Sequence, residues 1–312
     1  MLILQQLVNG LMLGGLYVMV AVAFTLIIGM LNFLNFTIPA QFMFAAVMMW
    51  ATMTGHLPFG NETLSAIFGS QYLWIAGILV AFVVSAVISL IIERFTYRYM
   101  KPKYGDATEH ALPLVSSLGF LIIIENFVIS AWGSDPLQIQ SPFGDASFTI
   151  GPLLFSYPQV ISLAISLGIV FTLSYVIRAT RLGRALRAIA ERPDTAVLMG
   201  VEVLRIVPVV YVITGLLCAT AGILFTINYT SIDAYIGDTV ATVAIAGMVL
   251  GGLGNVWGAV AGGLFIGVLE VFSIYIVGAD FAKVPIWGLL LLILVIRPTG
   301  LFGRAAIGKG KF

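Results

Sequence analysis

Long apolar runs separated by short polar segments make up most of this chain. A helix that crosses a membrane needs about twenty mostly apolar residues. Runs of about that length occur at 4–30, 72–92, 111–132, 157–177 and 206–227, and shorter or interrupted runs at 40–53, 239–277 and 284–296. We therefore expect an all-α polytopic membrane protein with about eight transmembrane segments, some broken or re-entrant, in a single domain over residues 1–312.

Polar residues and a proline interrupt the pattern between the first two runs. Irregular backbone at membrane depth is tolerated only where protein or a water-filled cavity satisfies its polar groups. The segment is therefore either a broken helix that lines a path or a short uncharged turn between two helices. Under the first interpretation the candidate path residues are Asn32, Asn35, Thr37 and Gln41.

Glycine interrupts the run 239–277 in the same way. The middle of this run, 251–258, carries no charge. Two short helices that meet at a glycine turn, or a re-entrant pair, would satisfy this pattern. A short strand or interfacial segment is expected at 147–150 in one of the polar loops.

Composition excludes a water-soluble globule. The chain is 60% hydrophobic and 9% charged, with a mean hydropathy of +1.08, whereas soluble domains are about 45–50% apolar and about a quarter charged. The single cysteine, Cys218, lies in an apolar run and cannot form an intrachain disulfide, so it is expected to be a small buried hydrophobe. The first apolar run lacks a preceding basic region and is expected to be a retained helix.

Positive charge is confined to a few places. Fourteen of the fifteen Lys and Arg residues fall in the clusters 94–103, 178–205 and 297–311, and Lys283 is the exception. Basic loops stay on the cytoplasmic side of a membrane. We therefore expect these clusters and the C-terminus in the cytoplasm and the cation-free loops 54–71 and 133–156 outside. The N-terminus is interpreted as external.

The segment 178–205 holds six of the cations and has helical character. Its apolar residues recur at i, i+4 and i+7, with charged residues on the other side, which is typical of an amphipathic helix on a surface. These positions are Leu182, Leu186 and Ile189 against Arg184, Arg187 and Glu191. Pro193 interrupts the pattern, and Asp194 is expected to cap a second short turn that closes at Gly200. The segment is either a connector or a contact site for a cytoplasmic partner.

The run LGRALRAIAE at 182–191, followed by Ala196, Leu198 and Gly200, resembles the cytoplasmic coupling loop of the branched-chain amino-acid type of ABC importer permease. Further similarity lies in Asn9-Gly10, Leu13-Gly14 and Tyr17, and in the glycine pattern at 251–263. Where the family usually has Asn-Phe-Ala-His-Gly, this chain has Asn-Phe-Thr-Ile-Pro at 35–39. That departure bears on the identity of the substrate.

The resemblance implies a permease subunit in the bacterial inner (plasma) membrane, with no ATPase site of its own. It implies two cytoplasmic ATP-binding-cassette ATPases, a second permease subunit that is identical or homologous, and an external solute-binding protein. Branched-chain or related amino acids are the expected substrates, with urea, amides or aromatic acids as the alternative. The loop residues expected to contact the ATPases are Arg184, Arg187, Ala188, Ala190, Glu191, Asp194, Ala196 and Gly200.

Catalytic and metal-binding patterns are missing from the sequence. There is no phosphate-binding glycine loop, no metal-ligand spacing and no nucleophile–base pair, so we expect no enzyme, no cofactor, no metal and no nucleic-acid partner. Two carboxyls, Glu125 and Glu270, fall within apolar runs, where ionisable groups usually face the interior of the bundle. Glu125 is a candidate path residue or a helix–helix hydrogen bonder. A self-contained secondary transporter remains the rival class.

Overall fold

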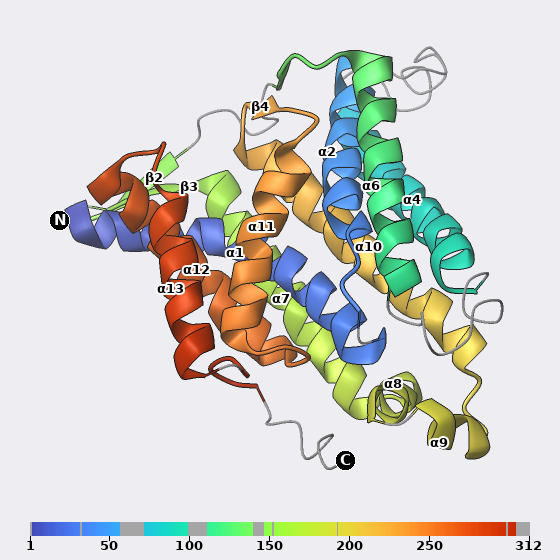
Figure 1. Cartoon of the computed structure of the whole chain (residues 1–312). Helices are drawn as coiled ribbons and strands as arrows, with labels where there is room; N and C mark the ends of the chain where they lie inside the picture. The colour runs from blue at the N-terminus through green and yellow to red at the C-terminus, as the bar shows by residue number, and fades with distance from the viewer. Residues whose placement is uncertain are drawn as a thin grey trace.

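Helices account for most of the computed structural model (Figure 1), which describes residues 2–31, 33–56, 72–98, 111–139, 147–151, 153–191, 193–297 and 299–303. The helices are α1 (Leu2–Leu31), α2 (Thr37–Thr54), α4 (Leu73–Glu93), a π-helical turn (Arg94–Arg98), α6 (Ala111–Trp132), α7 (Tyr157–Ala179), α8 (Arg181–Glu191), α9 (Pro193–Leu198), α10 (Val203–Asn228), α11 (Ile236–Gly251), α12 (Val256–Val277) and α13 (Lys283–Ile296). The strands are β1 (Leu137–Gln138), β2 (Ser147–Ile150), β3 (Leu153–Ser156) and β4 (Ser231–Ile232).

The predicted fold class is confirmed. Within the described residues six helices are long and apolar enough to cross a membrane, namely α1, α4, α6, α7, α10 and α12. The helices α11 and α13 are apolar but shorter. In α2, which has 18 residues, every residue from Thr37 to Thr52 is buried, so this helix lies inside the bundle.

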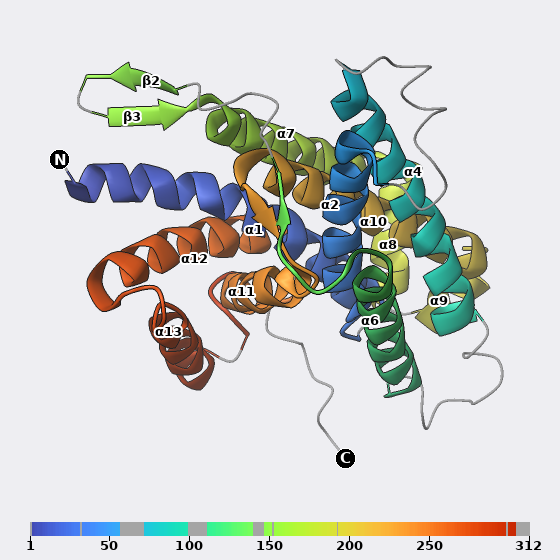
Figure 2. The ribbon, with the colours of Figure 1, turned by 90° about the horizontal axis from the view of Figure 1, so that it is seen from above.

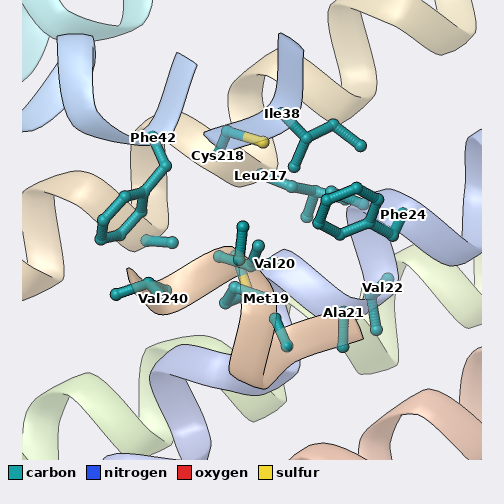
Figure 3. Close-up of a cluster of buried hydrophobic side chains, with 14 of the residues drawn as sticks. Met19, Val20, Ala21, Val22, Phe24, Ile38, Phe42, Leu217, Cys218 and Val240 are labelled. Carbon is teal, nitrogen blue, oxygen red and sulfur yellow. The ribbon is translucent and has the colours of Figure 1, made fainter. Parts of the chain in front are cut away.

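Helix α1 runs through the middle of the molecule, between α7 and α12 (Figure 2). A helix that is apolar on all sides is stable only when other elements surround it. The consecutive residues Val18 to Phe24 have no solvent exposure, and Figure 3 shows several of them packed against Phe42 of α2, Cys218 of α10 and Val240 of α11. Cys218 is buried and free, as predicted.

Glycines bring α1, α11 and α12 into backbone contact. A Cβ atom on Gly267 would lie 2.4 Å from Cα of Gly14, and one on Gly262 would lie 1.9 Å from the carbonyl oxygen of Gly247. Small residues permit this approach between helices in lipid. The run 239–277 therefore forms two helices joined at a glycine turn, although α12, with 22 residues, is longer than predicted.

The segment after α13 closes the turn between α11 and α12. The backbone N–H of Leu301 donates to the carbonyl of Leu250 (2.8 Å), and that of Phe302 donates to the carbonyl of Gly251 (3.1 Å). The side-chain amide of Asn255 donates to the carbonyl of Phe302 (3.1 Å). The last carbonyls of a helix have no partner within it, so this segment satisfies the end of α11.

Two short antiparallel strand pairs lie away from α8 and α9. Strand β2 is the one expected at 147–150, and it pairs with β3, whereas the pairing of β1 with β4 was not predicted. The side chain of Gln5 in α1 both donates to the carbonyl of Leu154 (2.8 Å) and accepts from its N–H (3.0 Å). The hairpin is thereby attached to the start of α1 (Figure 2).

Candidate functional site

Helices α8 and α9 form a separate unit at one end of the bundle, the end at which α13 finishes and opposite β4 (Figure 1). The chain enters this unit from α7 through a sharp corner at Thr180. The Thr180 hydroxyl accepts a hydrogen bond from the N–H of Gly183 (3.2 Å), and a Cβ atom on Gly183 would overlap the carbonyl of Ile177. Only glycine therefore fits at this point of the corner.

The predicted amphipathic helix is confirmed in α8. Leu186 and Ile189 are buried and Leu182 packs against the core, while Arg184, Arg187 and Glu191 are exposed. Arg187 Nη1 also donates to the carbonyl of Ile177 at the end of α7. A cation at this position complements the negative end of the α7 helix dipole, so Arg187 stabilises the corner between α7 and α8.

The other predicted coupling residues are spread over buried and exposed positions. Ala190 is exposed, Ala188 is half-buried, and Ala196 in α9 is buried. Gly200 lies beyond α9 with a φ of +84°, which fits its predicted role in ending the second turn. The prediction that Asp194 caps that turn is wrong, because α9 already begins at Pro193. Helix formation therefore starts one residue before the expected cap.

This unit has an exposed apolar tip, which consists of Val197, Leu198 and Met199; of these, only Leu198 was singled out in the sequence. Leu198 is 86% exposed and Met199 is 82% exposed. Apolar residues are normally predicted to face a core, so the pattern alone did not identify them. The ion pair between Arg205 and Glu202 (2.6 Å) follows the tip along the chain. A clustered apolar surface of this kind is typical of a protein contact site.

A second candidate region is the polar seam between α2, α4 and α10, in which buried hydroxyl, amide and carboxyl groups meet. At its centre Gln41 Oε1 accepts a hydrogen bond from Ser89 (3.3 Å), and Ser85 donates to the carbonyl of Gly215 (2.8 Å). Ser89 also donates to the carbonyl of Ser85 (2.8 Å). The three helices pack against one another in pairs, so this network lies in their common interface.

Three of the predicted path residues belong to this seam or border it. Asn35 Oδ1 accepts from both the backbone N–H (3.0 Å) and the hydroxyl (2.7 Å) of Thr37 at the start of α2, and Gln41 lies one turn further along. All three side chains are buried. In the described part of the connection between α1 and α2, the side chain of Asn35 is therefore bonded within the protein. Asn32 lies outside the described residues.

Glu93 and Tyr211 are seam residues that sequence analysis missed. Glu93 stands immediately before Arg94, so the sequence pattern assigns it to the polar loop that follows α4. The structure buries it at the end of α4, beside a π-helical turn, and π-helical turns are frequent at functional sites. Tyr211 is fully buried in α10, and its hydroxyl lies within electrostatic range of the Glu93 carboxyl.

The two carboxyls that were singled out in the sequence lie outside the seam. Glu125 of α6 is half-buried and hydrogen-bonds to the carboxyl of Asp238 at the start of α11. Two carboxyls form such a bond only when they share a proton. Glu270 of α12 lies close to the Tyr17 hydroxyl of α1. Both contacts join helices, which is the role that the alternative interpretation gave to Glu125.

The family of the chain follows from comparison with known sequences. The sequence pattern of the family described as branched-chain amino acid transport system / permease component matches residues 6–296. The chain belongs to this family. A permease of this family contains no ATPase domain, so the chain is a transport component and not an enzyme.

Similar permeases have been characterised in several bacteria. The chain is 31% identical over 312 residues to the high-affinity branched-chain amino acid transport system permease protein BraD of Pseudomonas aeruginosa, covering 98% of this chain and 97% of the relative. It is 29% identical over 311 residues to LivH of Escherichia coli, with the same coverage. It is 29% identical to the fructose import permease protein FrcC of Rhizobium meliloti, over 67% of this chain and 64% of the relative. No solved structure matches the permease chain.

Proposed function

We propose that this permease forms, with a second permease subunit, the membrane path of an ATP-driven importer for branched-chain or related amino acids. The observation that carries the proposal is the agreement with branched-chain amino acid permeases over nearly the whole length of both chains. The second subunit is a copy of this chain or a homologue. Residues 1–312 act as one permease domain, and an external solute-binding protein delivers the substrate.

Two cytoplasmic ATPases bind the unit formed by α8 and α9 in this proposal. The apolar tip at 197–199 supplies the surface that a partner covers, and Arg184, Ala190 and Glu191 lie exposed on the adjoining helix. Binding of a partner would remove the exposed leucine and methionine side chains from water, which stabilises the complex. Because α9 leads directly into α10, displacement of the tip moves the helix that carries Tyr211 and Gly215.

The distribution of cations supports an orientation with α8 and α9 in the cytoplasm of a bacterial cell. The described arginines lie at the ends of α4, α7 and α13 and around α8 to the start of α10, and basic segments stay on the cytoplasmic side of the inner membrane. Both the end of α13 and the C-terminus then face the cytoplasm. The start of α1, the β2–β3 hairpin and the β1–β4 pair face outward.

The predicted path residues enter this proposal through movement of the helices. Gln41 faces α4 and α10 in the present conformation, and Asn35 and Thr37 are buried near the start of α2, so substrate reaches these residues only when helices of the bundle separate. ATP binding and hydrolysis in the partners would supply the free energy for that separation through α9 and α10. The substrate path is otherwise formed with the second permease subunit.

The proposal is tested by replacing the apolar side chains of the tip and measuring ATP-driven uptake. In the double variant Leu198→Ser/Met199→Ser, we expect uptake of radiolabelled leucine by proteoliposomes to fall at least about tenfold, since a coupling free energy of 1–3 kcal/mol corresponds to 5–150-fold. The matched control is Phe302→Ser, which also removes an exposed apolar side chain, in the segment after α13. Unchanged uptake with bound ATPases would overturn the docking role. Arg187 is unsuitable for this test, because it also stabilises the α7–α8 corner.

A second substrate class follows from the fructose import permeases among the relatives. Competition with unlabelled solutes separates the candidates: leucine, isoleucine and valine should compete for uptake, whereas fructose, urea and amides should not. Transport by the purified chain in liposomes without ATPases would instead establish a self-contained secondary transporter and contradict the importer proposal.

A further inference from the structure

The inner part of the polar seam contains three buried polar groups with no hydrogen-bond partner in the described part of the chain. These groups are Asn35 Nδ2, Glu93 Oε1 and the Tyr211 hydroxyl. The three residues are 1%, 3% and 0% exposed, respectively. An unpaired buried polar group is destabilising because it has lost its hydrogen bonds to water, so three of them in one bundle call for a common partner.

Helix directions place the three groups at the same level of the bundle. Gly77 contacts Met49 and Ser89 contacts Gln41, so α4 runs antiparallel to α2, whereas Gly215 lies against Gln41 and Thr226 against Ala46, so α10 runs parallel to α2. Ser89, Gln41 and Gly215 therefore mark one level of the seam. One helical turn from that level towards α8 lie Glu93, Thr37 and Tyr211, since residues four apart share a helix face.

Asn35 lies at this level because its side chain is hydrogen-bonded to Thr37. Its Oδ1 is occupied by the backbone N–H and the hydroxyl of Thr37, and these two bonds fix the orientation of the side-chain amide. The Nδ2 group is therefore the end that lacks a partner. The level thus presents one amide donor, one carboxyl acceptor and one hydroxyl that both donates and accepts.

We propose that Asn35, Glu93 and Tyr211 bind a buried water molecule that links α2, α4 and α10. A buried water typically makes about three hydrogen bonds to polar groups that would otherwise be unsatisfied, which is the number of unpaired groups at this level. An N–H donor aimed at the site disfavours a metal cation. One turn away Gly215 packs directly against Ser89, which closes the site on that side.

The site has a consequence for movement of α10, and this part rests on the proposed function. A water molecule exchanges its hydrogen bonds more readily than two directly bonded side chains, so α10 can shift relative to α2 and α4 without leaving a buried group unsatisfied. Tyr211 lies two turns after the start of α10, close to the unit that the ATPases are proposed to move.

X-ray radiolysis labelling of the full-length chain in lipid nanodiscs tests the water site independently of transport. Radiolysis splits water into hydroxyl radicals, which label a buried ring only where a water molecule lies beside it. We expect Tyr211 to be labelled at a rate comparable with that of exposed Tyr235. The control rings, Phe24 and Phe42, are equally buried among apolar side chains and should remain unlabelled. Labelling of Tyr211 no faster than these rings would overturn the proposal.

A pair of variants assigns the water to Glu93. Glu93→Gln keeps an oxygen acceptor and should retain labelling of Tyr211, whereas Glu93→Leu removes the acceptor and should abolish it. Equal labelling of Tyr211 in both variants would show that Glu93 does not hold the water. If Glu93→Leu does not fold, Asn35→Ala provides the same comparison, and retained labelling in that variant would contradict the site as described.

Discussion

The two main helix interfaces of this bundle combine close glycine contacts and polar side chains in different proportions. Where α12 packs against α1 and α11, glycines on all three helices bring the backbones into direct contact. Where α2, α4 and α10 meet, buried serine, glutamine, glutamate and tyrosine side chains lie in the interface beside an apolar cluster. Both kinds of interface hold helices together in lipid, where no hydrophobic driving force favours helix association.

The difference indicates which interface can change. Backbone contacts at glycine leave no side chain that could rotate, so the α1–α11–α12 interface has one arrangement. The polar seam contains rotatable hydroxyls and three groups with spare hydrogen-bonding capacity. Its third helix, α10, continues directly from α9. We therefore infer that the glycine interface stays rigid and that the seam is the interface at which the helices move.

The largest expected effect is at the glycine interface. In Gly262→Ala the new methyl group would lie 1.9 Å from the carbonyl oxygen of Gly247, and backbone cannot give way. Overpacking costs about 1–3 kcal/mol and occasionally more, so we expect a clear fall in the thermal unfolding temperature in detergent. Gly119→Ala is the matched control, since nothing lies within 4 Å of its Cβ position. Equal unfolding temperatures for the two variants would contradict a rigid interface.

A smaller loss of stability is expected from a glycine-to-alanine substitution in the seam. In Gly215→Ala the new methyl group would lie 1.9 Å from Ser89 Oγ, and this atom belongs to a side chain. We expect a loss of about 1 kcal/mol and partial recovery in the double variant Gly215→Ala/Ser89→Ala, because neighbouring substitutions couple. Thermal unfolding of the two single variants and the double variant measures that coupling. Strictly additive losses would show that the hydroxyl is not the obstacle.

The smallest effect concerns a single hydrogen bond of the seam. Ser85→Ala removes the bond from Ser85 to the carbonyl of Gly215 (2.8 Å), and interhelical hydrogen bonds in membranes contribute about 0.6 kcal/mol on average. Ser166→Ala in α7 is the control, because its buried hydroxyl has no partner among the described residues and its loss should cost nothing. A larger loss in the Ser166 variant than in the Ser85 variant would reverse the expected order.

Local patterns were sufficient to predict much of the fold. The apolar runs correctly located the long helices, because length and hydropathy are properties of one segment at a time. The face of α8 formed by Leu186 and Ile189 followed from residue spacing, and the strand at 147–150 was also found. The glycine turn between α11 and α12 was one of the two alternatives expected for the run 239–277.

The polar seam could not be predicted, since it joins three segments far apart in the chain. Asn35 and Gln41 were singled out as polar residues beside a break, but nothing in the sequence places Ser85, Glu93 or Tyr211 near them. Glu93 precedes two arginines and therefore resembles the start of a loop. Burial of this carboxyl depends on the helical path of α4 and on how α10 packs against it, and neither is a local property.

The order of synthesis gives the segment after α13 a special importance. Leu301 and Phe302 supply the hydrogen bonds that the end of α11 lacks, yet a ribosome makes them about fifty residues after that helix is complete. Until then the carbonyls of Leu250 and Gly251 must find other partners. The corner between α11 and α12 is therefore among the last parts of the bundle to reach its final form, and a nascent chain that stops before residue 299 would enter the membrane with this corner unfinished.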